Sequence, residues 1–550
     1  MMVFKIIKKC FQDATHVEDD RADFFLEKND WNDYSYLTQF HLHATAKITQ
    51  GSNEYLGPIS IMRYGQNIKE YPLEGAVGGE YLSELPEDFC SLSFSLDLFA
   101  RLARYLDAEG RSEFIRLMHL ILDIESPYYD RAKDDDCFNK SLLRGGSMDS
   151  FALKKGKSLL YKTGQLYDLH KQELGFKLPG QEEEIRMRFT PPFDEVPDNY
   201  PLGVFAFIGK NGSGKSTVLY RLAKLLYADP KTRDIFAEKA GVLKPFDIGI
   251  YKLLLISYSA FDNFVLPGMN HEDYKMILER IEDNDGRFVF CGLRDVKAEY
   301  EVLLEMEEKK IREQVLEDRV LYEGIRLKPQ ERLGFEFTKA YGMIKDSRQW
   351  KDMIEEADIL ENQVVELNKK MRWNEDLARF YNEMSTGYKF FFHALAHVMA
   401  YVESDSMVLI DEPENYLHPP LLSFLIRQLR KIMKARHSVL MIATHSPVVL
   451  QEVMSENVCI IRRSGNAVSI RKPAIETYGE NLSAIVSDVF NLTSDNTGYY
   501  DVFDSLYDKW KCGRMETAEQ VLRIFTEKLG ARISTQMAQY LISKWITDNR

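Results

Sequence analysis

A glycine-rich loop between an apolar run and a helical pattern constrains the fold of this chain more than any other stretch. The run from Val204 to Ile208 predicts a buried strand, and the pattern from Val218 to Ala223 predicts the start of a helix. The loop between them consists of Gly209, Lys210, Asn211, Gly212, Ser213, Gly214, Lys215, Ser216 and Thr217. Strand, loop and helix in this order predict a phosphate-binding loop, because backbone N–H groups and the helix N-terminus both point at phosphate oxygens.

Two side chains at the end of this loop have defined tasks in nucleotide binding. Lys215 is expected to reach the β- and γ-phosphates of ATP, and Ser216 is expected to offer its hydroxyl to Mg²⁺. A match of this kind arises by chance in a chain of this length with odds of about one or two in a hundred, and the flanking strand and helix lower those odds. The sequence therefore predicts ATP and Mg²⁺ as ligands.

Two apolar strands further along the chain end in polar residues that suit ATP hydrolysis. One strand ends with Asp411 and Glu412, and the next ends with His445. Asp411 is expected to hold Mg²⁺ and Glu412 to activate the attacking water, while His445 lies where it could reach the γ-phosphate. A helix over 421–435 joins the strands, which predicts a β-α-β unit in a parallel sheet.

Composition and charge limit the class of protein. The chain of 550 residues has a net charge of −14, which argues against a surface built throughout for nucleic acid but leaves a local basic groove open. The cysteines are scattered without a CxxC pair, which suits a reducing cytosol and gives no zinc signal: Cys10, Cys90, Cys137, Cys291, Cys459 and Cys512. No apolar run approaches the roughly 20 residues that span a bilayer. We therefore expect a soluble, cytoplasmic protein with no membrane partner.

Changes of pattern along the chain predict its organisation. Alternating residues over 39–48 and 55–64 predict a hairpin, and the charged segment over 298–323 suits an exposed amphipathic helix or a short helical arm. The expected segments are an N-terminal part of the ATPase head with this hairpin (1–84), a helical insertion (85–185), the P-loop part of the head (186–264), a helical insertion or arm (265–380), the remaining motif-bearing part of the head (381–475) and a helical C-terminal segment (476–550).

Histidine pairs and a basic helix leave alternatives open. His41 and His43 share one face of a strand, and His393 and His397 are spaced i, i+4 on an apolar helix. Either pair could bind a metal, but packing histidines are the more common reading, and no third ligand is in view. The helix over 421–435 carries basic residues on one side, which fits either nucleic-acid contact or a solvated face.

The segment Ser385-Thr386-Gly387-Tyr388-Lys389 resembles the signature motif of ABC-type ATPases, and its order relative to the P-loop, the Asp-Glu pair and the histidine matches that group. The resemblance implies an α/β P-loop NTPase head of the ABC type with a mixed sheet, plus helical insertions and a helical C-terminal segment. It also implies a head-to-tail dimer, or a higher even-numbered assembly, in which Ser385 and Gly387 of one subunit close over the nucleotide of the other.

The strings 411–419 and 443–447 resemble the soluble branch that includes RecF-like, overcoming-lysogenization-defect and related bacterial defence ATPases. Chain size, the early helical segment and residues 256–262 are most similar to the PtuA-type ATPase of Septu anti-phage systems, which also occurs with certain retrons. That resemblance implies a separate HNH-type nuclease as partner and, in a retron, a reverse transcriptase with its RNA and DNA. Direct nucleic-acid contact stays open.

Departures from these families keep other functions open. ABC proteins usually carry a metal-contacting Gln after the second core strand, and there is none between Ser257 and Phe264. Ser259 or Asp262 is the candidate substitute; otherwise the contact is lost and hydrolysis is slow. After Ile475 there is no Glu followed by Asp-x-Asp, as a Toprim nuclease would need, and no HNH-like cluster. The alternatives to a defence ATPase are a RecF-like ATPase that clamps DNA and a scaffold that senses nucleotide and barely hydrolyses it.

Overall fold

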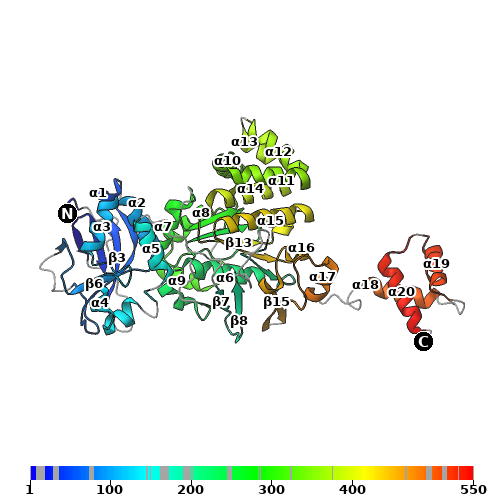
Figure 1. Ribbon diagram of the computed structural model, residues 1–550, viewed down its shortest axis with the longest axis horizontal. Helices are drawn as coiled ribbons and strands as arrows, with labels where there is room; N and C mark the ends of the chain where they lie inside the picture. Colours follow the sequence, from blue (N-terminus) through cyan, green and yellow to red (C-terminus); the bar gives the residue numbers. More distant parts are fainter. Residues whose placement is uncertain are drawn as a thin grey trace. The chain divides into compact units, whose positions relative to one another are not determined.

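The computed structural model divides the chain into two compact units, residues 1–479 and 480–550, which are described separately (Figure 1). None of the described helices combines the length and the apolar character that a membrane span requires. Four cysteines are described as free and buried, and Cys10 and Cys512 lie outside the described residues. The structure describes the chain apart from residues 1, 8–18, 29–35, 52, 74–79, 144–146, 149, 162–172, 190–199, 202, 229, 245–249, 283, 285, 322–324, 375, 465–466, 491–497, 511–516, 531 and 549–550.

The N-terminal part of the first unit has a six-stranded sheet of its own, in the order β5-β1-β2-β3-β4-β6. Its strands are β1 (Phe4–Ile7), β2 (Phe24–Lys28), β3 (Gln39–Ala44), β4 (Glu54–Arg63), β5 (Tyr81–Leu82) and β6 (Phe89–Leu92). The helical segments that follow or interrupt the strands are α1 (Ala46–Thr49), α2 (Leu96–Tyr105), α3 (Ala108–Leu117), α4 (Tyr129–Ala132), η2 (Phe138–Leu142) and α5 (Phe151–Tyr161). Apolar residues of the strands and of α2, α3 and α5 form one continuous core.

The predicted hairpin is present as the antiparallel pair β3–β4, but its context corrects the prediction. We expected residues 1–84 to belong to the ATPase head and 85–185 to be a helical insertion. Instead β6 pairs with the free edge of β4, and α2, α3 and α5 share the core of this sheet. The reason is burial: β4 is covered along most of its length, so it needs a partner on both edges and a helical layer, which a lone hairpin does not supply.

The P-loop strand belongs to a second, seven-stranded sheet in the order β12-β11-β13-β14-β9-β15-β16. All neighbours are parallel except the terminal hairpin β15–β16. The strands are β9 (Val204–Ile208), β11 (Lys252–Ser257), β12 (Phe288–Gly292), β13 (Ser406–Asp411), β14 (Val439–Thr444), β15 (Val458–Ser464) and β16 (Ala467–Arg471). Because β9, β13 and β14 are parallel, the segments that follow them meet at one edge of the sheet. A mixed α/β fold of the P-loop class is thus what the chain adopts.

Helices on this sheet carry the predicted motifs. They are α6 (Lys215–Tyr227), α14 (Thr386–Tyr401), the short turns η5 (Pro413–Asn415) and η6 (Ser455–Asn457), α15 (Pro419–Ala435) and α16 (Pro447–Leu450). The expected β-α-β unit is confirmed as β13-α15-β14 with parallel pairing. Apolar residues of α6 join those of the strands in one core, which fixes the loop before α6 against the sheet.

The structure of residues 265–380, which we expected to be a helical insertion or arm, differs from the prediction in two ways. It contains the edge strand β12, whose residues are all buried, and the segment expected to be an exposed helix is two helices that break near Met306. Tyr300 and Leu303 on the first, and Ile311 and Val315 on the second, lie in the main core, so the amphipathic pattern reflects packing on the sheet. The helices here are α7 (His271–Ile281), α8 (Val296–Glu305), α9 (Glu308–Leu316), α10 (Gln330–Ile344), α11 (Arg348–Leu360), α12 (Asn362–Arg372) and α13 (Leu377–Glu383).

A small antiparallel sheet, β10-β7-β8, completes the first unit. It is formed by β7 (Glu173–Lys177), β8 (Glu184–Arg188) and β10 (Val242–Lys244), with η4 (Pro230–Phe236) before β10. The second unit is helical, with α17 (Leu482–Phe490), α18 (Gly498–Trp510), α19 (Ala518–Leu529) and α20 (Thr535–Asp548). It has a separate small core that includes Tyr507, Phe525 and Leu541.

Candidate functional site

The loop between β9 and α6 has the backbone that a phosphate cradle requires. Gly212 and Gly214 have φ of 76° and 100°, a region that side chains with a Cβ rarely adopt. A Cβ on Gly209 would lie 2.3 Å from the carbonyl oxygen of Ile461, so only glycine allows the loop to approach β15 this closely. The loop then runs into the N-terminus of α6, where unpaired N–H groups favour an anion.

Lys215 is the first residue of α6 and is only 3% exposed. Its Nζ donates to the carbonyl oxygen of Lys210 at 3.3 Å and lies 3.7 Å from Glu412 Oε1. The lysine is therefore held across the concave side of the loop, next to the acidic end of β13. Lys210 and Asn211 are exposed, Ser213 is buried, and Thr217 is half-buried on the first turn of the helix.

Ser216 and Asp411 meet although they lie far apart in the sequence. Ser216 Oγ donates to Asp411 Oδ1 at 3.0 Å, because α6 begins at the edge of the sheet where β13 ends. A hydroxyl and a carboxylate are the hard oxygen ligands that Mg²⁺ takes beside nucleotide phosphates. The donor set at this point thus fits Mg²⁺.

Tyr220 and Asp262 add a network that the sequence did not predict as a unit. Tyr220 Oη lies 2.6 Å from Asp411 Oδ2 and 3.1 Å from Asp262 Oδ2, and Ser257 Oγ donates to Asp262. Asp262 is therefore linked to Asp411, the candidate metal ligand, through one tyrosine, in the segment where ABC proteins carry a Gln. Ser259, the other candidate substitute, bonds to Asp262 rather than to Asp411, and its hydroxyl also accepts from the backbone N–H of Phe261. The spacing of Tyr220, four residues after Ser216, places it on the same helix face and was the available signal.

Protonation in this network follows from burial. Burial raises the pKa of Asp411 to about 7, and Asp262 nearby adds to the shift, while the bonds from Tyr220 and Ser216 oppose it. Burial also raises the pKa of Asp262. Because only the carboxylate binds the metal, Mg²⁺ must compete with a proton at Asp411 when the pH is near or below this pKa.

This arrangement predicts that Mg²⁺-dependent ATP binding weakens as pH falls. Below the Asp411 pKa of about 7, the neutral acid predominates, so affinity should fall by about tenfold per pH unit. Titrations of Mg²⁺ at fixed ATP between pH 5.5 and 8.5, on the wild type and on Asp411→Asn, measure this. Protonation of the nucleotide is common to both proteins, so it cancels in the comparison. Equal slopes for the two proteins would contradict the assignment.

Glu412 and His445 face each other beyond the ends of β13 and β14. Glu412 has a left-handed backbone, φ 45° and ψ 58°, which turns its side chain toward Lys215 and His445. His445 Nδ1 lies 3.8 Å from Glu412 Oε1, and Asn415 Nδ2 donates to Glu412 Oε2 at 3.0 Å. Glu412 is 30% and His445 is 37% exposed, so both side chains are open to a nucleotide and water. A strained non-glycine backbone at this point is typical of a functional position.

Glu414 is a positioning residue that the sequence reading missed. Its Oε1 accepts from Thr444 Oγ1 at 2.7 Å and from the backbone N–H groups of His445 and Ser446. The same oxygen lies 3.0 Å from His445 Nδ1, and the side chain is only 7% exposed. One buried carboxylate therefore fixes the loop that carries His445.

Ser385 and Gly387 lie at the start of α14. Ser385 is the N-cap residue, is exposed, and makes no side-chain capping bond. A Cβ on Gly387 would lie 2.7 Å from the carbonyl oxygen of Tyr416, so glycine lets α14 pack against the loop after β13. No described contact joins Ser385 to the P-loop of its own chain, and its hydroxyl is available to an external acceptor.

Three basic residues of α15 form ion pairs within the chain. Arg427 and Lys431 both pair with Glu356, and Arg430 pairs with Glu452. The solvated-face reading is therefore favoured over nucleic-acid contact for these residues. In the N-terminal sheet, His41 contacts Tyr55 and His43 contacts Glu27, which fits the packing interpretation of that pair.

Comparisons with known proteins agree with this geometry in part. Residues 296–451 match the family model "AAA domain, putative AbiEii toxin, Type IV TA system", which covers Ser385, Asp411 and His445 but not the P-loop. The chain is also 28% identical over 528 residues to Protein ea59 of Escherichia phage lambda, covering 90% of each chain. Together with the phosphate-binding loop on the adjoining strand, this match supports an AAA-type ATPase domain in this part of the chain.

Proposed function

We propose that the chain hydrolyses ATP in a site shared by two copies. The observation that carries this is the division of the motifs: Lys215, Ser216, Asp411 and Glu412 converge within one chain, whereas the exposed Ser385 makes no contact with them. An ABC-type head-to-tail pair would place Ser385 of one subunit over the γ-phosphate held by the other.

The chain's own groups have distinct tasks in this mechanism. Lys215 and the loop N–H groups bind the β- and γ-phosphates, and Ser216 and Asp411 would hold Mg²⁺. When bound, Mg²⁺ neutralises charge on the transferred phosphoryl group. Glu412 accepts a proton from the attacking water, and His445, fixed by Glu414, donates to the γ-phosphate oxygen. The products are ADP and phosphate.

Mixing two inactive variants tests the shared site. Lys215→Ala and Ser385→Ala should each be nearly inactive alone, but an equal mixture should recover about a quarter of the wild-type rate. Random pairing puts about half of the chains in mixed dimers, and each mixed dimer has one intact site. Steady-state ATPase assays on the separate and mixed proteins measure this. A mixture no more active than either variant would contradict a site shared between subunits.

We further propose that the nucleotide state of this assembly controls a separate HNH-type nuclease in anti-phage defence. One observation supports the proposal: the matched family is described as a putative AbiEii toxin. Cleavage would then fall to that separate chain. In a retron setting, the assembly would also hold a reverse transcriptase with its RNA and DNA.

Purification from the native cells tests the partner. We expect an HNH-type nuclease to co-elute with the wild-type chain at physiological salt. When Glu412→Gln is purified with ATP, the amount of nuclease bound per chain should differ from that in the wild type. Recovery of the chain with no nuclease in either state would contradict control of a partner, while leaving the ATPase proposal intact.

A slow-hydrolysing sensor is the second candidate function, and the Asp262–Tyr220–Asp411 network favours it. This network replaces the usual Gln with a half-buried acid of raised pKa, so proton release accompanies metal binding. Single-turnover kinetics separate the two functions: a bound ATP that persists for many minutes supports the sensor, whereas turnover within seconds supports the ATPase.

A further inference from the structure

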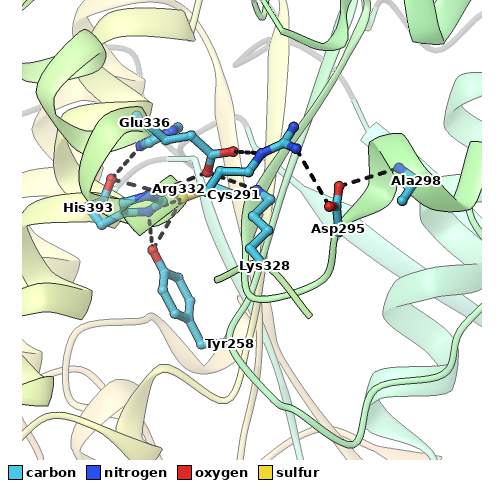
Figure 2. A network of polar contacts seen from close by, with 9 residues as sticks. Tyr258, Cys291, Asp295, Ala298, Lys328, Arg332, Glu336 and His393 are labelled. Carbon is cyan, nitrogen blue, oxygen red and sulfur yellow. Dashed lines mark hydrogen bonds and ion pairs between the residues drawn. The ribbon is translucent and has the colours of Figure 1, made fainter. Parts of the chain in front are cut away.

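A buried cluster of ligand-type side chains lies away from the nucleotide site. Cys291 on β12 and the pair His393 and His397 on α14 bring one sulfur and two ring nitrogens within 4.8 Å of one another. Cys291 and His393 are 0% exposed and His397 is 1% exposed. Figure 2 shows Cys291, His393 and Tyr258 pointing toward one another between the sheet and α14.

The hydrogen bonds of the two histidines fix which ring nitrogen of each can act as a ligand. His397 Nδ1 bonds to the carbonyl oxygen of His393 at 2.8 Å, which makes Nδ1 the protonated nitrogen and leaves a lone pair on Nε2. His393 Nδ1 lies 3.1 Å from Cys291 Sγ. A backbone carbonyl that fixes the tautomer of a histidine is the usual outer contact of a metal ligand.

The second ring nitrogen of His393, Nε2, lacks a hydrogen-bond partner among the described residues. It is buried and lies 3.8 Å from Glu336 Oε2. A small rotation of the ring would let Nε2–H donate to Glu336, whose carboxylate is already held by Lys328 and Arg332. A carboxylate behind a ligating histidine orients it and raises its basicity.

Burial keeps these three side chains in their uncharged forms. It lowers the pKa of His397 to about 4, lowers that of His393 well below its usual value, and raises the pKa of Cys291 to about 12. The histidines are therefore neutral, as a ligand must be, and the thiol gives up its proton only to a strong Lewis acid. The hydroxyl of Tyr258 bonds to His393 and lies 3.4 Å from Cys291 Sγ. Its oxygen is therefore available as the fourth ligand atom, beside one sulfur and two nitrogens.

We propose that Cys291, His393 and His397 form a structural zinc site that fastens the signature helix α14 to the edge of the sheet. One sulfur and two imidazoles suit zinc, whose bonds of about 2.0–2.3 Å in a tetrahedron place the donors about 3.3–3.6 Å apart. The ligand atoms lie within 4.8 Å of one another. Side-chain movements of about 1 Å would bring them to the separations of a zinc site. The site lacks access for a substrate, which makes its role structural. The backbone carbonyl oxygen of Tyr258 also accepts from Tyr416 Oη at 2.7 Å, so the site adjoins the loop after β13.

Metal analysis of untagged protein tests the proposal. Wild type purified with added zinc should contain about one zinc per chain, and Cys291→Ser and His397→Gln should lose it. Cys459→Ser is the matched control, because Cys459 is an equally buried thiol on β15 of the same sheet and is not part of this cluster. It should keep the zinc.

Cobalt gives a second readout that does not depend on the variants folding. Wild type treated with a chelator and then given Co²⁺ should show a thiolate-to-cobalt absorption band, and the chelated protein should unfold at a lower temperature than the zinc-loaded one. A folded, ATP-binding wild type with no zinc above the Cys291→Ser level and no cobalt–thiolate band would overturn the proposal, and the cluster would then be a hydrogen-bonded core.

Discussion

Replacing Glu412 with Gln is expected to lower the rate of ATP hydrolysis by about 10²–10⁴-fold while ATP stays bound, because the amide cannot take a proton from water. The change is nearly isosteric, so the left-handed turn at this position and the bond from Asn415 should survive. The substitution also removes the negative charge that lies 3.7 Å from Lys215 Nζ. Lys215 is then more readily available to bind the phosphates. Single-turnover hydrolysis and equilibrium ATP binding measure the two effects separately.

Glu414→Gln is the matched control for this experiment. Its side-chain carbonyl can still accept from Thr444 and the backbone of His445, so hydrolysis should fall far less than in Glu412→Gln. A Glu412→Gln variant with the wild-type rate, or a larger loss in Glu414→Gln, would contradict the assignment of Glu412 as the base.

Replacing Lys215 with Ala is expected to weaken ATP binding by about 10- to 150-fold, because a hydrogen bond to a charged group contributes about 1.5–3 kcal/mol. The loop would also lose the contact from Lys215 to the carbonyl oxygen of Lys210, which closes it around the phosphates. Titration with a fluorescent ATP analogue measures the loss.

Lys239→Ala is a suitable control for Lys215→Ala, since Lys239 is a largely exposed lysine that pairs with Glu317. It should bind ATP as the wild type does and unfold at the same temperature. Unchanged ATP affinity in Lys215→Ala would exclude the P-loop as the nucleotide site.

The local motifs of the fold were predictable from the sequence because their geometry is set within a few residues. The loop before Lys215 and the strand ending in Asp411 each combine a short apolar run with defined polar residues. The β-α-β unit followed from chain order, since a helix between two apolar strands returns the chain to a parallel neighbour.

The remaining features depend on residues far apart in the sequence. The N-terminal sheet was missed because β6 pairs with β4 across a long connection, and β12 was missed because one short buried run among helices has no helical or strand period of its own. The same holds for function: His393 and His397 were visible as a pair, but Cys291 reaches them from a strand about a hundred residues earlier. Asp262 and Asp411 likewise meet only through Tyr220, on a third element.

The mass of the Glu412→Gln assembly in solution tests the central claim most directly. Native mass spectrometry of this variant with ATP and Mg²⁺ should give an even-numbered assembly, with a dimer of twice the 64.0 kDa chain mass as the smallest form, carrying one ATP per chain. Without nucleotide, or with Ser385→Ala added, the dimer should dissociate. A variant that binds ATP fully and stays a monomer would contradict a nucleotide site shared between two copies.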